Sequence, residues 1–216
     1  REGIPVYSKF FPDGNVGVQE ISLFTRNVYS VYALANWGKE EKVLSLAQLK
    51  GLTYKASDIA DICSGAEASV MTGSTQAEFP FVAPLQIHME RIVGKISVVC
   101  DFNGLDKNAS INIEGVSIKN VPLECSLFGE NVAGEVADGI TYEGEELSAI
   151  SYKGVSFYMF ENMQGEVPGA AGNKEKAELI GQERGKLCSY VEIKANIVTF
   201  RHKGDIVYRF FLGTAD

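Results

Sequence analysis

The order of apolar and polar positions along the chain predicts a protein made mainly of β-strands. Short runs rich in β-branched and aromatic residues are separated by Gly, Pro, Asn and Asp, which favour turns. The predicted strands span residues 4–11, 16–23, 28–36, 85–102, 109–121, 155–160, 190–200 and 206–212. Turn residues at 12–15 and 25–27 separate the first three strands, which predicts an antiparallel meander.

Three of these segments carry more detailed signals. Apolar and polar residues alternate most clearly over residues 85–102. Within 109–121, Gly115 predicts a bulge or bend, and Pro122 is expected to close the strand. A turn at residues 203–205 predicts that the last two strands form a hairpin.

Helical signals are short and lie between the strands. Residues 45–50 are amphipathic, and residues 57–62 offer a second helix with Ser57 as the expected N-cap. A helical turn is also predicted at residues 174–180, within a Gly-rich and charged insertion. These segments indicate helical excursions from a β framework, and they do not indicate a helical bundle.

A change in composition between residues 129 and 154 indicates the domain organisation. Gly, acidic and small residues dominate this stretch, and aromatic residues almost vanish from it. We therefore expect an inter-domain connection or a long exposed loop over residues 129–154. The flanking residues 1–128 and 155–216 are expected to form separate N-terminal and C-terminal domains, which the length of 216 residues allows.

Charge and hydropathy exclude several classes of protein. The net charge of -8 argues against a protein that binds a nucleic-acid backbone, because such binding needs a clustered positive surface. No run of 18 apolar residues is long enough for a membrane-spanning helix. The chain begins with Arg1, so a preceding piece is expected to be missing, and the lack of a targeting segment is uninformative.

The four cysteines, Cys63, Cys100, Cys125 and Cys188, are widely spaced. Because no Cys-x-x-Cys pair is present, the sequence excludes zinc-ribbon and thioredoxin-like sites. We expect buried thiols that pack as small hydrophobic residues. The spacing cannot choose among the possible disulfide pairings, but Cys100 and Cys125 end β-like segments and are the first candidates for a bridge.

Residues with catalytic potential lack suitable neighbours in the sequence. His88 and His202 lie in strand-like segments without His, Cys or Asp at ligand spacing, so we expect exposed strand histidines. Glu143, Glu145 and Glu146 form an acidic group, but no apolar pocket would raise a pKa for glycoside hydrolysis. We predict no catalytic residue, no cofactor site and no metal site, and the chain is not expected to be an enzyme.

Three further segments are expected to have structural roles. Residues 101–106 are similar to a calcium loop, but Asp106 occupies the position that needs glycine, so an Asn-Gly turn between strands is expected. Residues 165–174 lack the Gly-Lys-Ser/Thr order of a phosphate loop and indicate a flexible surface loop. Trp37 is expected to pack internally, with carbohydrate stacking as the alternative.

Five motifs, in the same order along the chain, resemble segments of the Bacteroidales-type fimbrillin family. They are VYALANWG at residues 31–38, VMTG at 70–73, LQIHMERIVGKI at 85–96, KNVP at 119–122 and YMFENMQG at 158–165. In the third motif, Gly94 stands where the family usually has alanine.

The resemblance implies a mainly β fold of two tandem transthyretin-like β-sandwich domains with short helical excursions, the second domain being incomplete. It implies a structural or adhesive subunit of bacterial surface fimbriae that is exported as a lipoprotein and located in a fimbrium anchored at the outer membrane. The expected partners are other fimbrial subunits, joined by strand exchange through sheet edges, and host or bacterial surface receptors. No nucleic-acid partner is expected.

The family also usually has a lipobox cysteine and a strand upstream of the residues present here, and a further strand after a segment like residues 211–213. The resemblance therefore implies a fragment truncated at both ends, whose open sheet edges are templates for pairing. The alternative function is that of a non-polymerising cell-surface β-sandwich lipoprotein that binds carbohydrate or protein. The missing catalytic constellation disfavours a third reading, a glycosidase on a β scaffold.

Overall fold

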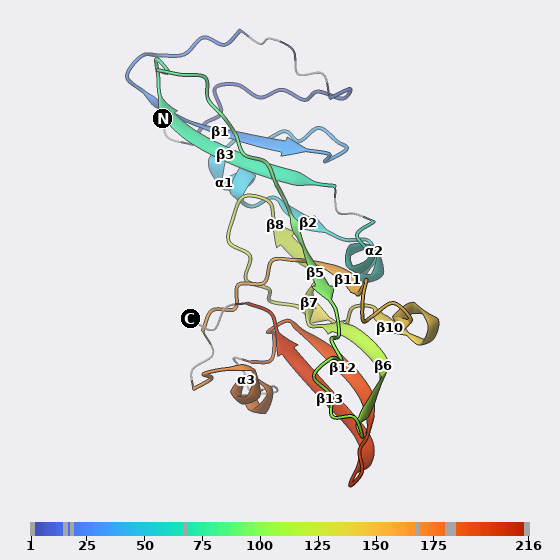
Figure 1. The fold of residues 1–216 in the computed structure, drawn as a ribbon. Coiled ribbons are helices and arrows are strands. Elements are labelled where there is room, and N and C mark those ends of the chain that lie inside the picture. The colour runs from blue at the N-terminus through green and yellow to red at the C-terminus, as the bar shows by residue number, and fades with distance from the viewer. Residues whose placement is uncertain are drawn as a thin grey trace. The chain divides into compact units, whose positions relative to one another are not determined.

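The computed structural model describes residues 3–14, 17, 20–66, 69–166, 169–179 and 185–213 (Figure 1). The fold is mainly β, as the sequence predicted, with 36% strand and 11% helix among the described residues. Among the described residues, no helix is long and apolar enough to cross a membrane. The chain forms two compact units. Unit 1 comprises Arg1–Tyr54, Ala68–Ile92 and Ser126–Glu130, and unit 2 comprises Lys55–Glu67, Val93–Cys125 and Asn131–Asp216.

Short strands and helices alternate along the described residues. The strands are β1 (Val28–Ala35), β2 (Thr53–Lys55), β3 (Met71–Glu78), β4 (Glu90–Arg91), β5 (Val93–Val98), β6 (Ser110–Lys119), β7 (Val121–Pro122), β8 (Glu124–Ser126), β9 (Val136–Ala137), β10 (Thr141–Glu143), β11 (Val155–Phe160), β12 (Tyr190–Val198) and β13 (Lys203–Phe211). The helices are α1 (Leu46–Lys50), α2 (Ile59–Ser64), α3 (Asn173–Leu179) and the 3-10 helix η1 (Gly144–Leu147).

Unit 1 contains an antiparallel sheet in the order β1–β3–β4. β1 and β3 pair residue by residue over their whole lengths and lie side by side in Figure 1. β4 pairs with only the first two residues of β3. Val70 and Leu127 are the only buried hydrophobic residues in the described part of this unit. Unit 1 therefore has a thin core.

The N-terminal meander predicted from the sequence is wrong. Residues 4–11 form no strand, and Ile4 and Val6 are 60% and 65% exposed, so too little apolar surface is buried there to order one. The predicted strand at 16–23 lies partly outside the described residues, and its described residues are not a strand. The strand predicted at 28–36 is confirmed as β1, but it pairs with β3, which is distant in sequence.

The strand predicted at residues 85–102 is divided. Residues 93–98 form β5, whereas residues 85–89 form no strand, although their side chains alternate between half-buried and exposed. The pairing of β3 with this segment stops at Thr72 opposite Glu90. Beyond it, the carbonyl oxygen of His88 lies where a Cβ on Gly73 would stand, so the backbone passes close to β3 at a place that requires glycine.

Unit 2 contains two main sheets. The larger is antiparallel in the order β10–β6–β12–β13, and the smaller pairs β11 with β5. The core cluster joins Val116 and Ile118 of β6, Val191 of β12, and Phe157 and Met159 of β11. Side chains from the two sheets thus share one core, as in a β-sandwich.

Register within the larger sheet confirms the bulge predicted at Gly115. Lys194 of β12 lies opposite Gly115, but the next residue, Ala195, lies opposite Ile113, which leaves Glu114 as the extra residue. This extra residue keeps Ile113 and Val116 on the same face of β6, although they are three positions apart.

The C-terminal hairpin is confirmed, but its turn lies earlier than predicted. β12 and β13 pair from Tyr190 opposite Phe211 to Val198 opposite Lys203. Residues 203–205 are therefore in the strand, and the turn lies at residues 199–202. Thr199 Oγ1 accepts hydrogen bonds from the backbone N–H groups of Arg201 (3.3 Å) and His202 (2.9 Å), so the threonine side chain supplies the turn chemistry.

Residues 129–154 do not form an open connection. β10 pairs with β6 along Ser117–Gly115, and Leu147 and Ile150 are buried in the core of unit 2. The two units are also not divided at the limits expected from composition, because each unit combines three separate stretches of the chain. Composition could not reveal this arrangement, since only a few apolar residues of the segment, such as Leu147 and Ile150, reach the core, and Tyr152 is 80% exposed.

Short helices form at the predicted places, with one difference in capping. Helix α1 begins after Ser45, whose Oγ accepts a hydrogen bond from the N–H of Gln48 at 3.2 Å. Helix α2 begins one residue later than expected, because its N-cap is Asp58 instead of Ser57. Asp58 Oδ1 accepts a hydrogen bond from Ala60 N at 2.9 Å. Its negative charge at the N-terminus of the helix also interacts favourably with the helix dipole. Helix α3 confirms the third helical prediction as far as the described residues extend.

Candidate functional site

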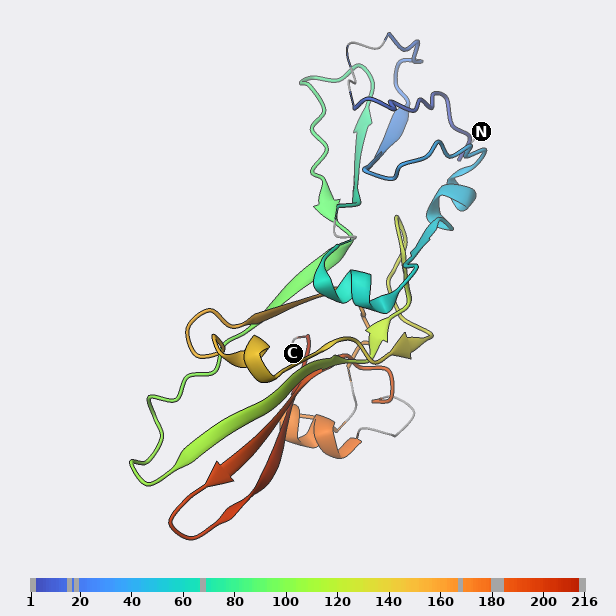
Figure 2. The ribbon, with the colours of Figure 1, turned by 90° about the vertical axis from the view of Figure 1, so that its right-hand side faces the viewer.

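The open edge of the larger sheet in unit 2 is formed by β13 (Figure 2). Two backbone hydrogen bonds, from Leu212 N to Ser189 O and from Thr199 N to His202 O, identify which residues pair toward β12. Because these pairs alternate along an antiparallel ladder, the even-numbered residues of β13 pair toward β12. The backbone groups of Asp205, Val207 and Arg209 therefore point away from the sheet.

The side chains of β13 that face the core side of the sheet are incompletely covered. Tyr208 lies opposite Ile193, and Phe210 lies opposite Val191, so both share the face of these core residues. Tyr208 and Phe210 are nevertheless 46% exposed each. The smaller sheet has only two strands, and its buried side chains pack against β6 and β12. The edge therefore combines unpaired backbone groups with exposed apolar side chains.

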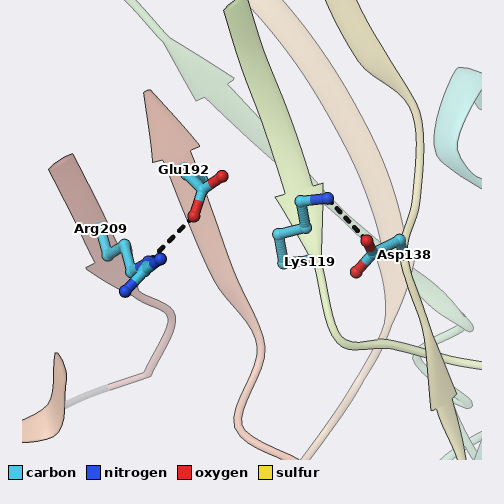
Figure 3. A network of polar contacts seen from close by, with 4 residues as sticks. All are labelled: Lys119, Asp138, Glu192 and Arg209. Atoms are coloured by element: carbon cyan, nitrogen blue, oxygen red, sulfur yellow. Dashed lines mark hydrogen bonds and ion pairs between the residues drawn. The ribbon is translucent and has the colours of Figure 1, made fainter. Parts of the chain in front are cut away.

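The opposite face of the same sheet carries two ion pairs (Figure 3). Arg209 Nε donates a hydrogen bond to Glu192 Oε2 at 2.9 Å, and Glu192 is only 7% exposed. Lys119 Nζ pairs with Asp138 Oδ2 at 2.7 Å. Burial, and secondly the nearby Glu192 carboxylate, raise the pKa of Tyr190. Glu192 and Asp138 therefore each have a basic partner within the chain.

One end of the β13 edge is already closed. Asn173, the first residue of α3, accepts a hydrogen bond from the backbone N–H of Phe211 at 3.0 Å. The backbone N–H of Phe211, like those of the other odd-numbered residues of β13, points away from β12. Asn173 therefore binds the last outward-pointing N–H group of the strand. The available part of the edge therefore ends at Arg209.

Unit 1 has a second open edge, along β1. The backbone hydrogen bond from Phe79 N to Asn27 O shows that odd-numbered residues of β1 pair toward β3. The backbone groups of Val28, Ser30, Tyr32 and Leu34 consequently point outward. No strand pairs with this side of β1 within the described residues.

A polar network holds the chain before β12, and Asn120, Asn162 and Gln164 in it belong to the fimbrillin-like motifs. Asn120 Nδ2 donates to Cys188 O at 2.8 Å, and Ser189 Oγ donates to Asn120 O at 2.6 Å. Asn162 Nδ2 donates to Ser189 Oγ at 2.8 Å, and Gln164 Nε2 donates to Asn162 Oδ1 at 2.7 Å. The motifs KNVP and ENMQG therefore meet at Ser189, and the arrangement is structural. The resemblance identified these motifs but gave no sign that they meet.

The histidines and acidic residues considered from the sequence are exposed. His88 and His202 are both exposed. Glu143, Glu145 and Glu146 are exposed around η1, where Glu146 Oε2 accepts a hydrogen bond from the backbone N–H of Glu143. In the part of the chain that the structure describes, no three His, Cys, Asp or Glu residues gather closely enough to hold a metal ion.

The segment at residues 101–106 uses its carboxylates for turns. Asp101 Oδ1 accepts a hydrogen bond from Asn103 N at 2.9 Å, and Asp106 Oδ1 accepts one from Asn108 N at 2.8 Å. Both are Asx turns, which reverse the chain between β5 and β6 as an Asn-Gly connection was expected to do.

Trp37 is half-buried, and its ring is engaged from several sides. Its Nε1 donates a hydrogen bond to Glu41 Oε1 at 3.1 Å, and Lys39 Nζ lies 4.8 Å from the ring centroid. The ring of Tyr54 meets it edge-on at 5.8 Å. The hydrogen bonds from Lys39 and then Trp37 lower the pKa of Glu41. These contacts favour the packing role that the sequence predicted.

The cysteines are thiols, and the bridge considered between Cys100 and Cys125 is not formed. Cys63 and Cys125 are buried, and Cys100 and Cys188 are half-buried. Burial raises the pKa values of Cys63, Cys100 and Cys188. The expectation that these residues pack as small hydrophobic groups is thus confirmed most clearly at Cys63, which belongs to the core of unit 2.

Comparison with known proteins gives two findings. The model of a family described as a domain of unknown function (DUF4906) matches residues 157–216, which extend from β11 to beyond β13. The chain is also similar to a crystal structure from Bacteroides eggerthii DSM 20697 that is described as a "putative cell adhesion protein", with a TM-score of 0.50 and 14% identity. No curated protein matches the chain.

The structural similarity concerns the fold alone at this level of identity. It covers 84% of this chain and 61% of the other, so the chain spans about three fifths of the length of that structure. The match agrees with the mainly β architecture of both units. The family match falls on the strands that build the open edge of unit 2.

Proposed function

We propose that this protein is a non-enzymatic subunit of bacterial surface fimbriae that mediates cell adhesion. Its neighbours would be other fimbrial subunits, joined to it by strand exchange, in a fimbrium anchored at the outer membrane. The five ordered fimbrillin-like motifs support the class of protein. The similarity to a structure described as a "putative cell adhesion protein" supports the adhesive role.

The observation that carries the assembly mechanism is the state of unit 1. In the part of the chain that the structure describes, its sheet has an unpaired edge along β1, and Val70 and Leu127 are its only buried hydrophobic residues. Val28, at the start of β1, is 59% exposed. A strand from another subunit would pair with the outward backbone groups of β1, and its alternating apolar side chains would enlarge the core.

Ser30 allows this mechanism to be tested at one backbone group. Its N–H points away from β3, so proline removes no hydrogen bond of the ladder, and proline is tolerated on an edge strand. The full-length protein with its native termini would be exported, processed and examined for fibres by electron microscopy. We expect fibres from the parent protein and few or none from Ser30→Pro.

The matched control is Val207→Pro, which removes an outward N–H from the edge strand of unit 2 and should leave fibres intact. Far-UV circular dichroism would verify that both variants are folded. If the exported parent protein stays monomeric and off fibres, the alternative function, a non-polymerising surface-binding module, replaces this proposal. A glycan array would then test carbohydrate binding directly.

A further inference from the structure

We propose that two copies of this chain pair through their β13 strands, antiparallel and about a two-fold axis at Val207. The four-stranded sheets of unit 2 would then form one continuous sheet across both copies. This inference concerns a different edge from β1 and does not depend on fimbrial assembly. A two-fold contact uses the same surface on both copies, so it closes at two and does not propagate into a fibre.

The backbone of β13 presents the groups that such a ladder needs. The N–H and C=O groups of Asp205, Val207 and Arg209 point outward, and no hydrogen bond within the described chain uses them. With Val207 opposite itself, Asp205 lies opposite Arg209 of the second copy. The ladder ends there because Asn173 holds the N–H of Phe211, the next outward donor.

Charge favours this register over a register shifted along the strand. Charged residues on an edge strand commonly prevent pairing between copies. Here the two positions that are symmetric about Val207 carry opposite charges, so each Asp205 meets an Arg209. Asp205 Oδ1 accepts a hydrogen bond from Asn196 and Arg209 Nε donates one to Glu192, which leaves Asp205 Oδ2 and the Arg209 Nη groups for the second copy.

Shape favours the same register on the core-facing side of the sheet. Tyr208 would lie opposite Ile206 of the second copy, and Phe210 would lie opposite Gly204. Nothing occupies the 4 Å around the place where a Cβ on Gly204 would stand, so the space is open to an aromatic ring. An aromatic side chain packed over a glycine on the neighbouring strand is a known stabilising pair. Phe210, which is 46% exposed, would gain this cover.

On the other face, Val207 would meet Val207 of the second copy. This side chain is 51% exposed, and a direct cross-strand pair of β-branched residues buries apolar surface on both copies. Backbone donors, charges and apolar side chains thus all agree on a single register. An unrelated strand could form the same backbone hydrogen bonds, but it would lack the charge pairs and side-chain contacts that a second copy of β13 provides.

Disulfide trapping tests the register. In a hydrogen-bonded antiparallel pair, opposite Cα atoms lie about 5.5 Å apart, a distance that a disulfide spans. We expect Val207→Cys to give a covalent dimer under mild oxidation. Lys203→Cys is the matched control, because it lies on the same strand and its counterpart would be eight positions along the ladder, about 26 Å away. The parent chain, with its own four cysteines, measures the background.

Sedimentation velocity on the same protein tests the contact without a cross-link. We expect a concentration-dependent dimer that Val207→Pro abolishes and that Asp205→Lys weakens about tenfold or more, since both symmetric charge pairs become repulsive. Ser30→Pro should leave the dimer unchanged, which separates this inference from the proposed fimbrial assembly. The inference is overturned if Val207→Cys cross-links no better than Lys203→Cys, or if the dimer survives both β13 variants.

Discussion

Arg209 Nε donates a hydrogen bond to Glu192 Oε2 at 2.9 Å across the β12–β13 pair, directly between opposite residues. The Glu192 side chain is 9% exposed, whereas Arg209 is 39% exposed. Without Arg209, the buried Glu192 carboxylate would lose its basic partner. Without Glu192, the more exposed Arg209 could still be solvated by water.

Arg209→Ala should lower the free energy of unfolding by about 1–3 kcal/mol, because it leaves a buried carboxylate without its partner. Urea unfolding followed by circular dichroism would measure the change. Asp138→Ala is the control, since the Lys119–Asp138 pair is more exposed and its loss should cost about 0–1 kcal/mol. Equal costs for the two variants would contradict the importance of burial at Glu192.

Gly73→Ala should destabilise the protein by about 1–3 kcal/mol, because the added methyl group would collide with the backbone carbonyl of His88. Gly94→Ala provides the control within a strand. Nothing lies within 4 Å of the place where its Cβ would stand, so it should stabilise by about 0.4–1 kcal/mol. Alanine is also the residue that the fimbrillin-like motif usually has at this position. Denaturation midpoints of the two variants should therefore move in opposite directions.

Asn162→Ala should cost about 1–3 kcal/mol, because it removes hydrogen bonds to Leu187 O, Ser189 Oγ and Gln164 Nε2 at a half-buried place. Asn103→Ala is the matched control at an exposed turn. The Asx hydrogen bond there joins the backbone N–H of residue 103 to the Asp101 side chain, so the substitution keeps it and should hardly change the free energy of unfolding. Unfolding by urea would compare the two. A neutral Asn162→Ala would show that the network before β12 does not stabilise the fold.

The stability of the protein should decline in alkaline solution. Burial raises the pKa of Cys63 above its ordinary value of 9.0, so the folded chain keeps a proton that the unfolded chain releases first. The protonated Cys63 thiol contributes fully to the free energy of unfolding below the ordinary thiol pKa of 9.0, and this contribution is lost as the pH rises through the pKa of the folded state. Urea unfolding at pH 7, 8.5 and 10 should show this fall, and Cys63→Ala should reduce its size. A constant stability from pH 8 to 10 would be contrary evidence.

Local patterns identified those parts of the fold that local sequence controls. Runs rich in β-branched and aromatic residues predicted β1, β11 and the β12–β13 hairpin, and Gly115 marked the bulge in β6. Tertiary contacts overrode the pattern at residues 4–11, where apolar residues found no strand to pair with. The candidate edges could not be predicted as particular strands, because an edge is defined by the neighbour that a strand lacks.

The sequence by itself determined that the chain is mainly β and where its clearest strands and short helices lie, since side-chain alternation and capping depend on nearby residues. Only the tertiary structure decided that β6 pairs with β12, some 80 residues further on, and that β13 is left at the border of the sheet. It also decided that Leu147 and Ile150, within a Gly-rich stretch, complete the core. Pairing and burial depend on which distant segments meet, and no local pattern contains that information.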